Sequence, residues 1–219
     1  MGLMRITVLV SGRGSNLAAL IAASRAPDFK GAVTHVVSSR AGVGALRMAD
    51  DNAIATSIVD AGAFARRDAF DAAITAAVNA SEPDLVVLAG FMRVLADDFV
   101  QRHATRLLNI HPSLLPAYPG LSTHKRALAD GARVHGCTVH FVTPAVDTGP
   151  IVAQAAVPVR PDDDEATLEA RVLAEEHRLL PTVVRWFCAG DVALEHGRVR
   201  RSEGAQREGA LRFPPIGAT

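Results

Sequence analysis

Cysteine is scarce in this sequence, and its scarcity excludes one class of protein. The 219 residues include two cysteines, Cys137 and Cys188, whose spacing is typical of neither a disulfide pair nor a metal site. A small secreted scaffold held by disulfides is therefore excluded. We expect both cysteines to be reduced thiols in a reducing compartment.

A net charge and a long apolar run are also missing. The 23 lysines and arginines balance the 23 aspartates and glutamates, so the whole molecule has no electrostatic tendency to bind nucleic acid or an anionic membrane. The apolar run at 6–10 is too short for a signal-peptide core or a membrane span. We expect a cytoplasmic protein with no nucleic-acid or membrane partner, in which any site for an anion is local.

Short apolar strands alternate with helical patterns along most of the chain. Strands are expected at 5–10, 32–37, 56–59, 85–88, 107–110, 137–142 and 151–157. Helices are expected at 16–24, 44–51, 66–79, 97–102, 123–130 and 165–187, the last bent or restarted near Pro181. Residues 192–195 and 198–200 are expected to form a hairpin.

This alternation is typical of a parallel sheet that helices cover on both faces. We predict an α/β fold: an open, mostly parallel, twisted sheet with helices on both faces, Rossmann-like, and with antiparallel C-terminal strands. Hydrophobic residues make up 49% of the chain, enough for a sizeable core. We expect one domain over residues 1–200, followed by an irregular tail at 201–219.

The first candidate site is the turn after the first strand, SGRGSN at 11–16. Small residues let backbone N–H groups and a helix N-terminus approach a phosphate, and Ser15 adds a hydroxyl. Leu17 stands where a dinucleotide site needs a third glycine, so a single phosphate fits better than a pyrophosphate. An ordinary tight turn is the alternative.

The second candidate site is the end of the fifth strand, where Asn109 and His111 are on the same side because strand residues alternate. Ligands of open α/β sheets bind at this edge. An amide beside an imidazole can stabilise an oxyanion and transfer a proton, as acyl transfer requires. No serine or cysteine nucleophile with its own base is evident nearby. A polar strand end with a satisfied histidine is the alternative.

The third candidate site is the loop at 143–150, in which Asp147 is a single carboxylate among apolar neighbours. A carboxylate near His111 would keep that imidazole protonated near neutrality. For Asp147 to reach His111, the sixth and seventh strands must return to the same end of the sheet. A surface turn is the alternative.

A metal site is not expected. His135, Cys137 and His140 are close in sequence, but strand alternation turns His140 away from the other two, so the three cannot converge on one ion.

Several motifs in this order make the chain resemble one known family, the phosphoribosylglycinamide formyltransferases. They are SGRGSN at 11–16, LAGFMRVL at 88–95, NIHPSLLPAYPG at 109–120, THKRALADG at 123–131, HGCTVHFV at 135–142 and D-x-G-P at 147–150. NIHPSLLP is shared with methionyl-tRNA formyltransferase, but that enzyme is expected to carry a further C-terminal β-barrel. A formyltetrahydrofolate hydrolase is expected to carry an extra N-terminal domain.

The resemblance implies a role for each matching residue. Asn109, His111 and Asp147 match the catalytic residues. Gly14, Ser15 and Asn16 match the loop that holds the substrate phosphate, and Glu176 matches the carboxylate on the ribose hydroxyls. Arg67, Met92, Arg93, Val94, Leu95 and Thr143 match the folate side. Ser122 and Pro144 depart from the family pattern near the folate pocket, and a cis bond is expected at Leu115-Pro116.

The resemblance also implies an activity in de novo purine biosynthesis. The formyl group of 10-formyltetrahydrofolate, a co-substrate, would pass to the amine of N1-(5-phosphoribosyl)glycinamide (glycinamide ribonucleotide) by direct attack, with no metal and no ATP. Formyl transfer to another amine, and a catalytically silent phosphosugar-binding module, are the alternatives. A homodimer is left open.

Overall fold

The computed structural model describes residues 2–202, so most of the expected tail lies outside the described residues. The strands are β1 (Met4–Val10), β2 (Gly31–Ser38), β3 (Ala55–Ile58), β4 (Leu85–Leu88), β5 (Leu107–His111), β6 (Val134–Phe141), β7 (Ile151–Pro158), β8 (Val192–Glu195) and β9 (Arg198–Arg201). The helices are α1 (Ser15–Ser24), α2 (Gly44–Asp51), α3 (Arg67–Ala80), α4 (Asp97–Arg102), α5 (Thr123–Ala129) and α6 (Glu165–Ala189), with a short 3-10 helix at Ala61–Ala63.

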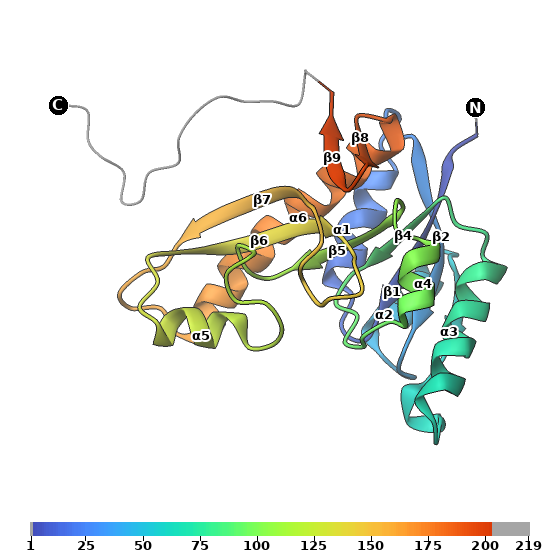
Figure 1. The fold of residues 1–219 in the computed structure, drawn as a ribbon, viewed down its shortest axis with the longest axis horizontal. Coiled ribbons are helices and arrows are strands. Elements are labelled where there is room, and N and C mark those ends of the chain that lie inside the picture. Colours follow the sequence, from blue (N-terminus) through green and yellow to red (C-terminus); the bar gives the residue numbers. More distant parts are fainter. Residues whose placement is uncertain (1, 203–219) are drawn as a thin grey trace.

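Seven strands form one sheet in the order β3-β2-β1-β4-β5-β6-β7. The pairs from β3 through β5 are parallel, whereas β6 pairs antiparallel with both β5 and β7. The long β6 and β7 extend to one side of the molecule, away from the parallel part (Figure 1). The predicted α/β class, the mostly parallel sheet and the antiparallel C-terminal strands are confirmed.

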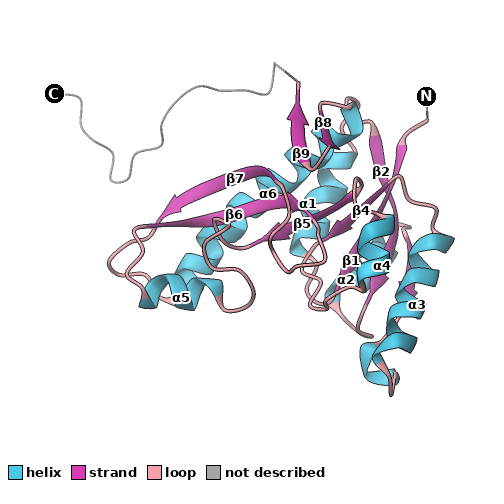
Figure 2. Ribbon diagram, in the orientation of Figure 1, coloured by secondary structure: helices cyan, strands magenta, loops and turns pink. Residues whose placement is uncertain are grey.

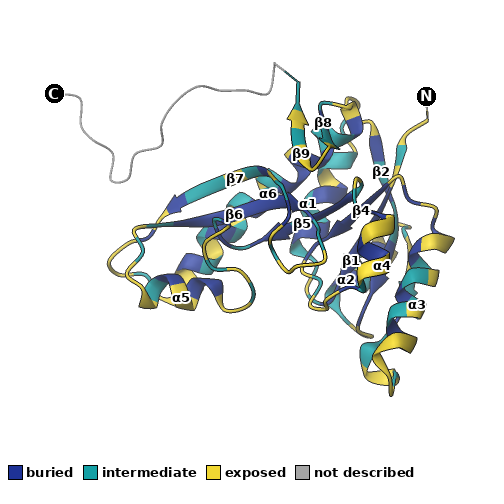
Figure 3. Cartoon of the chain, viewed as in Figure 1, coloured by how far each residue is buried: buried dark blue, intermediate teal, exposed yellow. Residues whose placement is uncertain are grey.

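Helices cover both faces of the parallel part of the sheet, as predicted (Figure 2). On β1, Ile6, Val8 and Val10 pack in a core with residues of α1, α2 and α6. Leu9 points the other way, into a second core built with α3 and α4. Because strand side chains alternate, this arrangement buries nearly the whole strand, which is dark blue in Figure 3.

Most predicted boundaries differ from the observed ones by at most one residue, and three differences have a structural explanation or consequence. Strand β6 begins at Val134 rather than at 137, because its pairing with β7 continues through Gly136 to Pro158, and a side-chain Cβ at 136 would lie 2.0 Å from the Ala155 oxygen. Helix α6 includes Pro181 and continues as one element to Ala189. Arg201, assigned to the irregular tail, instead pairs with Val192 in the predicted hairpin.

Candidate active site

The fifth strand positions the first two residues of the site. Leu108 and Ile110 of β5 point into the core beneath α1 and α6, so Asn109 and His111 point to the opposite face. The loop at 142–150 begins beside the first residue of β5, because the Val142 N–H donates to the Leu107 oxygen at 3.0 Å. The loop then returns across that face to His111. The expectation that Asp147 reaches His111 only from the same sheet end was therefore wrong, although the two residues do meet.

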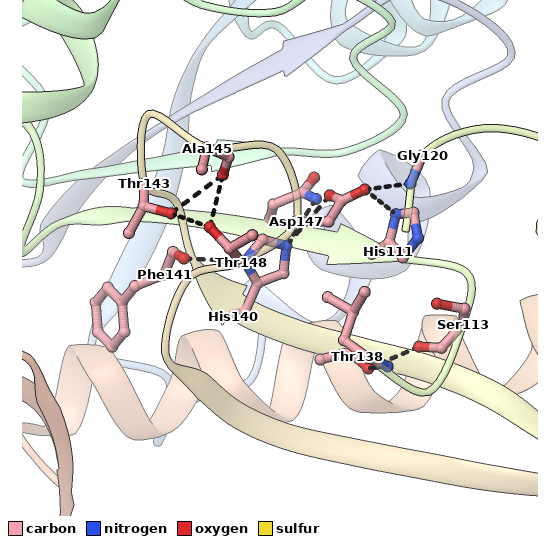
Figure 4. Close-up of polar contacts among 12 residues, drawn as sticks. His111, Ser113, Gly120, Thr138, His140, Phe141, Thr143, Ala145, Asp147 and Thr148 are labelled. Carbon is pink, nitrogen blue, oxygen red and sulfur yellow. Dashed lines mark hydrogen bonds and ion pairs between the residues drawn. The ribbon is translucent and has the colours of Figure 1, made fainter. Parts of the chain in front are cut away.

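Asp147 lies between two histidines, as Figure 4 shows. Its Oδ2 is 3.4 Å from His111 Nδ1 and accepts a 2.7 Å hydrogen bond from the backbone N–H of Gly120. The Nε2–H of His111 donates to the Tyr118 carbonyl oxygen at 3.1 Å. Both side chains are over 90% buried. The carboxylate therefore faces Nδ1 of a ring whose opposite nitrogen is already fixed.

His140 is a member of this group that the sequence did not reveal. It lies opposite Asn109 on the neighbouring strand, and its Nδ1–H donates to the Phe141 oxygen at 2.9 Å. Burial lowers the pKa of His140, and this outweighs the opposite effects of the Phe141 carbonyl and Asp147. The neutral ring therefore has its lone pair on Nε2, which accepts from Asn109 Nδ2 at 3.1 Å. The alternation of His140 against His135 was the available signal, but only the β5–β6 register places it beside Asn109.

The turn after β1 has the features of an anion-binding loop. Gly14 precedes α1 in a left-handed conformation with φ of 85°, and a Cβ at this position would lie 2.7 Å from that of Ala45. No side chain caps the N-terminus of α1, and no acidic residue lies in its first turn. The loop is therefore close-packed and leaves the positive end of the helix without a capping side chain of its own.

Asn16 connects this turn to α6. Its Nδ2 donates to Glu176 Oε2 at 2.6 Å, while its buried Oδ1 has no hydrogen-bond partner. Burial raises the pKa of Glu176, and the hydrogen bond from Asn16 opposes part of that increase. The structure thus brings two predicted substrate-binding residues from opposite ends of the chain into direct contact.

Four of the six predicted folate-side residues line one cavity of about 470 Å³. Its lining includes Arg67, Met92, Arg93 and Val94, and the Arg67 guanidinium donates to the Val94 oxygen at 3.1 Å. The other two predicted residues lie elsewhere. Leu95 is buried in the core beneath α3 and α4, and the Thr143 hydroxyl bonds within its own loop to the Ala145 oxygen.

Ser11 joins the phosphate turn to the folate-side wall. Its hydroxyl accepts from the backbone N–H of Met92 at 2.9 Å, and its own N–H donates to the Gly90 oxygen at 3.1 Å. The two candidate binding regions therefore share a rigid backbone connection.

Three further expectations can be placed. Leu115-Pro116 is cis, as predicted. Ser122 has φ of 55° and immediately precedes α5. His135 packs edge-on against the rings of Tyr118 and His124, so it does not converge with His140.

Comparison with known proteins agrees with this geometry. The chain matches the formyl transferase family model over residues 4–184, and it therefore belongs to that family. It is 46% identical to phosphoribosylglycinamide formyltransferase of Escherichia coli K12, over 98% of each chain. The prediction of this family from the motifs is thereby confirmed.

Two further matches agree. The chain is 43% identical to human trifunctional purine biosynthetic protein adenosine-3 over 89% of its own length, which corresponds to 19% of that protein. The crystal structure of glycinamide ribonucleotide transformylase 1 from Symbiobacterium toebii superposes with a TM-score of 0.86 at 45% identity, covering 91% of this chain and 94% of that one.

Proposed function

We propose that this enzyme transfers the formyl group of 10-formyltetrahydrofolate to the amine of glycinamide ribonucleotide in purine biosynthesis. One observation carries the proposal: Asp147 faces His111 Nδ1 at 3.4 Å, and Asn109, on the same face of β5, donates to His140, whose ring lies 3.8 Å from the same carboxylate. An anion-binding turn and the cavity beside Arg67 supply candidate sites for the two substrates. Membership of the formyl transferase family supports the reaction class.

The chemistry follows from where charge develops. When the amine attacks the formyl carbon, a new C–N bond forms and negative charge accumulates on the formyl oxygen. Asn109 has a second amide hydrogen that is not donated to His140, and with the imidazolium of His111 it stabilises this oxyanion. Asp147 places a negative charge 3.4 Å from His111 Nδ1.

The second half of the reaction breaks the bond between the carbon and N10 of the folate. The attacking amine loses one proton and the leaving nitrogen gains one, so His111, or a water that it orients, can carry the proton between them. The reaction balances without ATP, a metal ion or a covalent enzyme intermediate. Holding both substrates together supplies the remaining advantage.

We assign the binding roles as follows. Gly14, Ser15 and Asn16 hold the phosphate, and Glu176 accepts hydrogen bonds from the ribose hydroxyls. On the folate side, Arg67 binds the glutamate tail, Met92, Arg93, Val94 and Leu95 form the wall beside the pterin, and the loop from Thr143 to Asp147 closes the pocket. The partners in this proposal are the two small molecules, and the cytoplasm is the compartment in which both are expected.

A direct assay tests the proposal. Purified protein is offered 10-formyltetrahydrofolate with glycinamide ribonucleotide, with methionyl-tRNA or with water alone, and loss of the formyl group is followed. Rapid loss with the ribonucleotide alone is expected. Equal loss with water would indicate a hydrolase, loss with methionyl-tRNA another acceptor, and binding of the ribonucleotide without turnover a silent phosphosugar-binding module.

A further inference from the structure

Arg13 lies inside the phosphate turn but contacts a helix from the other end of the chain. Its guanidinium Nη2 is 3.0 Å from Oε1 of Glu169 on α6, and the arginine side chain is 82% exposed. Glu169 precedes Glu176 on the same helix, and α6 packs beside α1 (Figure 1). Helix α6 therefore contacts the turn through two carboxylates: Glu169 pairs with Arg13, and Glu176 accepts a hydrogen bond from Asn16.

These carboxylates repel a phosphate that enters the turn. A phosphate monoester carries between about −1.5 and −2 charges near neutral pH. At the turn it would meet the positive end of α1, but Glu169 lies nearby and repels it. Arg13 is the one cation of segment 11–16 and lies two residues before the first residue of α1, and its contact with Glu169 keeps the guanidinium between that carboxylate and the turn.

We propose that Arg13 is a substrate-binding residue that exchanges Glu169 for the phosphate of the acceptor substrate. The inference rests on the proposed function, because it assumes that a phosphorylated acceptor occupies the turn. In the free enzyme, Glu169 holds the guanidinium beside the turn. In the complex, the guanidinium contacts the phosphate, and the enzyme thereby favours phosphorylated over unphosphorylated acceptors.

The two ion pairs differ in the direction that this exchange requires. An exposed arginine–carboxylate pair contributes little, because solvent screens it and two flexible side chains must be ordered. A guanidinium can donate to two phosphate oxygens at once, and the phosphate carries more negative charge than the Glu169 carboxylate. Replacing Glu169 by the phosphate therefore stabilises the complex without a change of fold.

Removal of the cation is the first test. Arg13→Gln should raise KM for glycinamide ribonucleotide about five- to tenfold at low ionic strength, with kcat and KM for the folate within about twofold. Added salt should reduce the difference from wild type, because it screens the charge. The matched control is Arg185→Gln. Arg185 lies on another part of α6 and forms a similar exposed pair with Asp28, so its loss should leave every kinetic constant unchanged.

Removal of the competing carboxylate is the second test. Glu169→Gln should lower KM for the ribonucleotide about twofold, and its effect should be larger in the Arg13→Gln background, where nothing neutralises Glu169. If the ion pair had only a structural role, Glu169→Gln would weaken binding of the ribonucleotide as Arg13→Gln does. That result, or an unchanged KM in Arg13→Gln, would overturn the proposal.

Ribose 5-phosphate binding, measured by calorimetry, separates the two levels of inference. Arg13→Gln should weaken it by the same factor as KM. If wild type neither turns over the ribonucleotide nor binds ribose 5-phosphate, the proposed function fails. If wild type does both and Arg13→Gln is indistinguishable from it, only the role of Arg13 fails.

Discussion

Asp147 combines an uncommon backbone conformation with a buried carboxylate. Its φ is 55°, in the left-handed region that few side chains adopt without strain. Aspartate and asparagine tolerate this region better than most residues. The loop therefore restricts the choice of residue at this position, and aspartate is one that supplies a charge to His111.

Asp147→Asn separates that charge from the shape of the loop. The amide oxygen can still accept from Gly120, but the negative charge facing His111 Nδ1 is lost. We expect kcat to fall by on the order of a hundredfold, the usual scale for losing acid–base assistance, with little change in substrate KM. Turnover within a few-fold of wild type would contradict the assigned role.

His140 acts through Asn109 and is a positioning residue. Its unprotonated Nε2 requires that the amide nitrogen of Asn109, not the oxygen, faces it. His140→Leu should therefore lower kcat about tenfold, because the Asn109 amide is free to rotate, whereas KM should change little. His140→Gln supplies another acceptor and should recover most of the loss. Equal kcat in the leucine and glutamine variants would argue that only packing matters.

The turn at 11–16 illustrates a constraint at the scale of an element. Gly14 has both a positive φ and no room for a Cβ against α2, whereas a Cβ at Gly12 would meet nothing within 4 Å. The two glycines of one turn therefore have different tolerance for substitution.

Gly14→Val should weaken glycinamide ribonucleotide binding at least tenfold and spare the folate, because α1 and its N–H groups must shift away from α2. Gly12→Ala is the matched control and should retain wild-type affinity for both. Circular dichroism would establish that each variant is folded. Equal weakening of both substrates in Gly14→Val would argue against a local phosphate site.

Elements were predicted better than the contacts between them. Helix α2 and strand β4 have the predicted bounds because their apolar patterns are bounded by glycine, asparagine or proline. The role of His140 was missed because strand alternation gives its face but not its cross-strand neighbour, which depends on the register with Asn109. The Arg13–Glu169 pair is likewise absent from any local pattern, because its members are 156 residues apart.

The candidate residues were recovered unevenly for a similar reason. Asn109 and His111 are visible as alternating polar residues at a strand end, whereas Glu176 is one of many glutamates until α6 is placed beside Asn16. Residue roles on the folate side depend on the resemblance, and the structure adds that Leu95 supports the wall from the core rather than lining the cavity.

The whole molecule should become less stable in acid because it buries neutral histidines. Burial lowers the pKa of His135 to about 4; the nearby His124 lowers it further, and the backbone of Pro112 opposes part of the effect. The unfolded chain binds a proton below about pH 6.5. The folded state does not bind it until about pH 4, so stability is lost as the pH falls between these values.

His135→Phe should reduce this pH dependence while keeping a ring against Tyr118 and His124. The free energy of unfolding, measured by denaturant titration from pH 7.5 to 4, should fall less steeply than in wild type, by up to ~1.4 kcal/mol per pH unit. Identical slopes in the two proteins would show that His135 does not titrate differently in the folded and unfolded chains.

The long sequence separation of the Asn16–Glu176 contact has a consequence for how the enzyme assembles. The contacts of Asp147 with Gly120 and of Asn109 with His140 span 27 and 31 residues, whereas Asn16 and Glu176 are 160 apart. Opening of α6 would break the Asn16–Glu176 contact of the ribonucleotide site, whereas the backbone hydrogen bonds that join β5 to β6 do not involve α6. The ribonucleotide is expected to bind only when α6 is docked on α1. It should therefore slow hydrogen exchange in α1 and α6 more than in β5 and β6. In this molecule the acceptor substrate would stabilise the contact between the first and last helices of the domain.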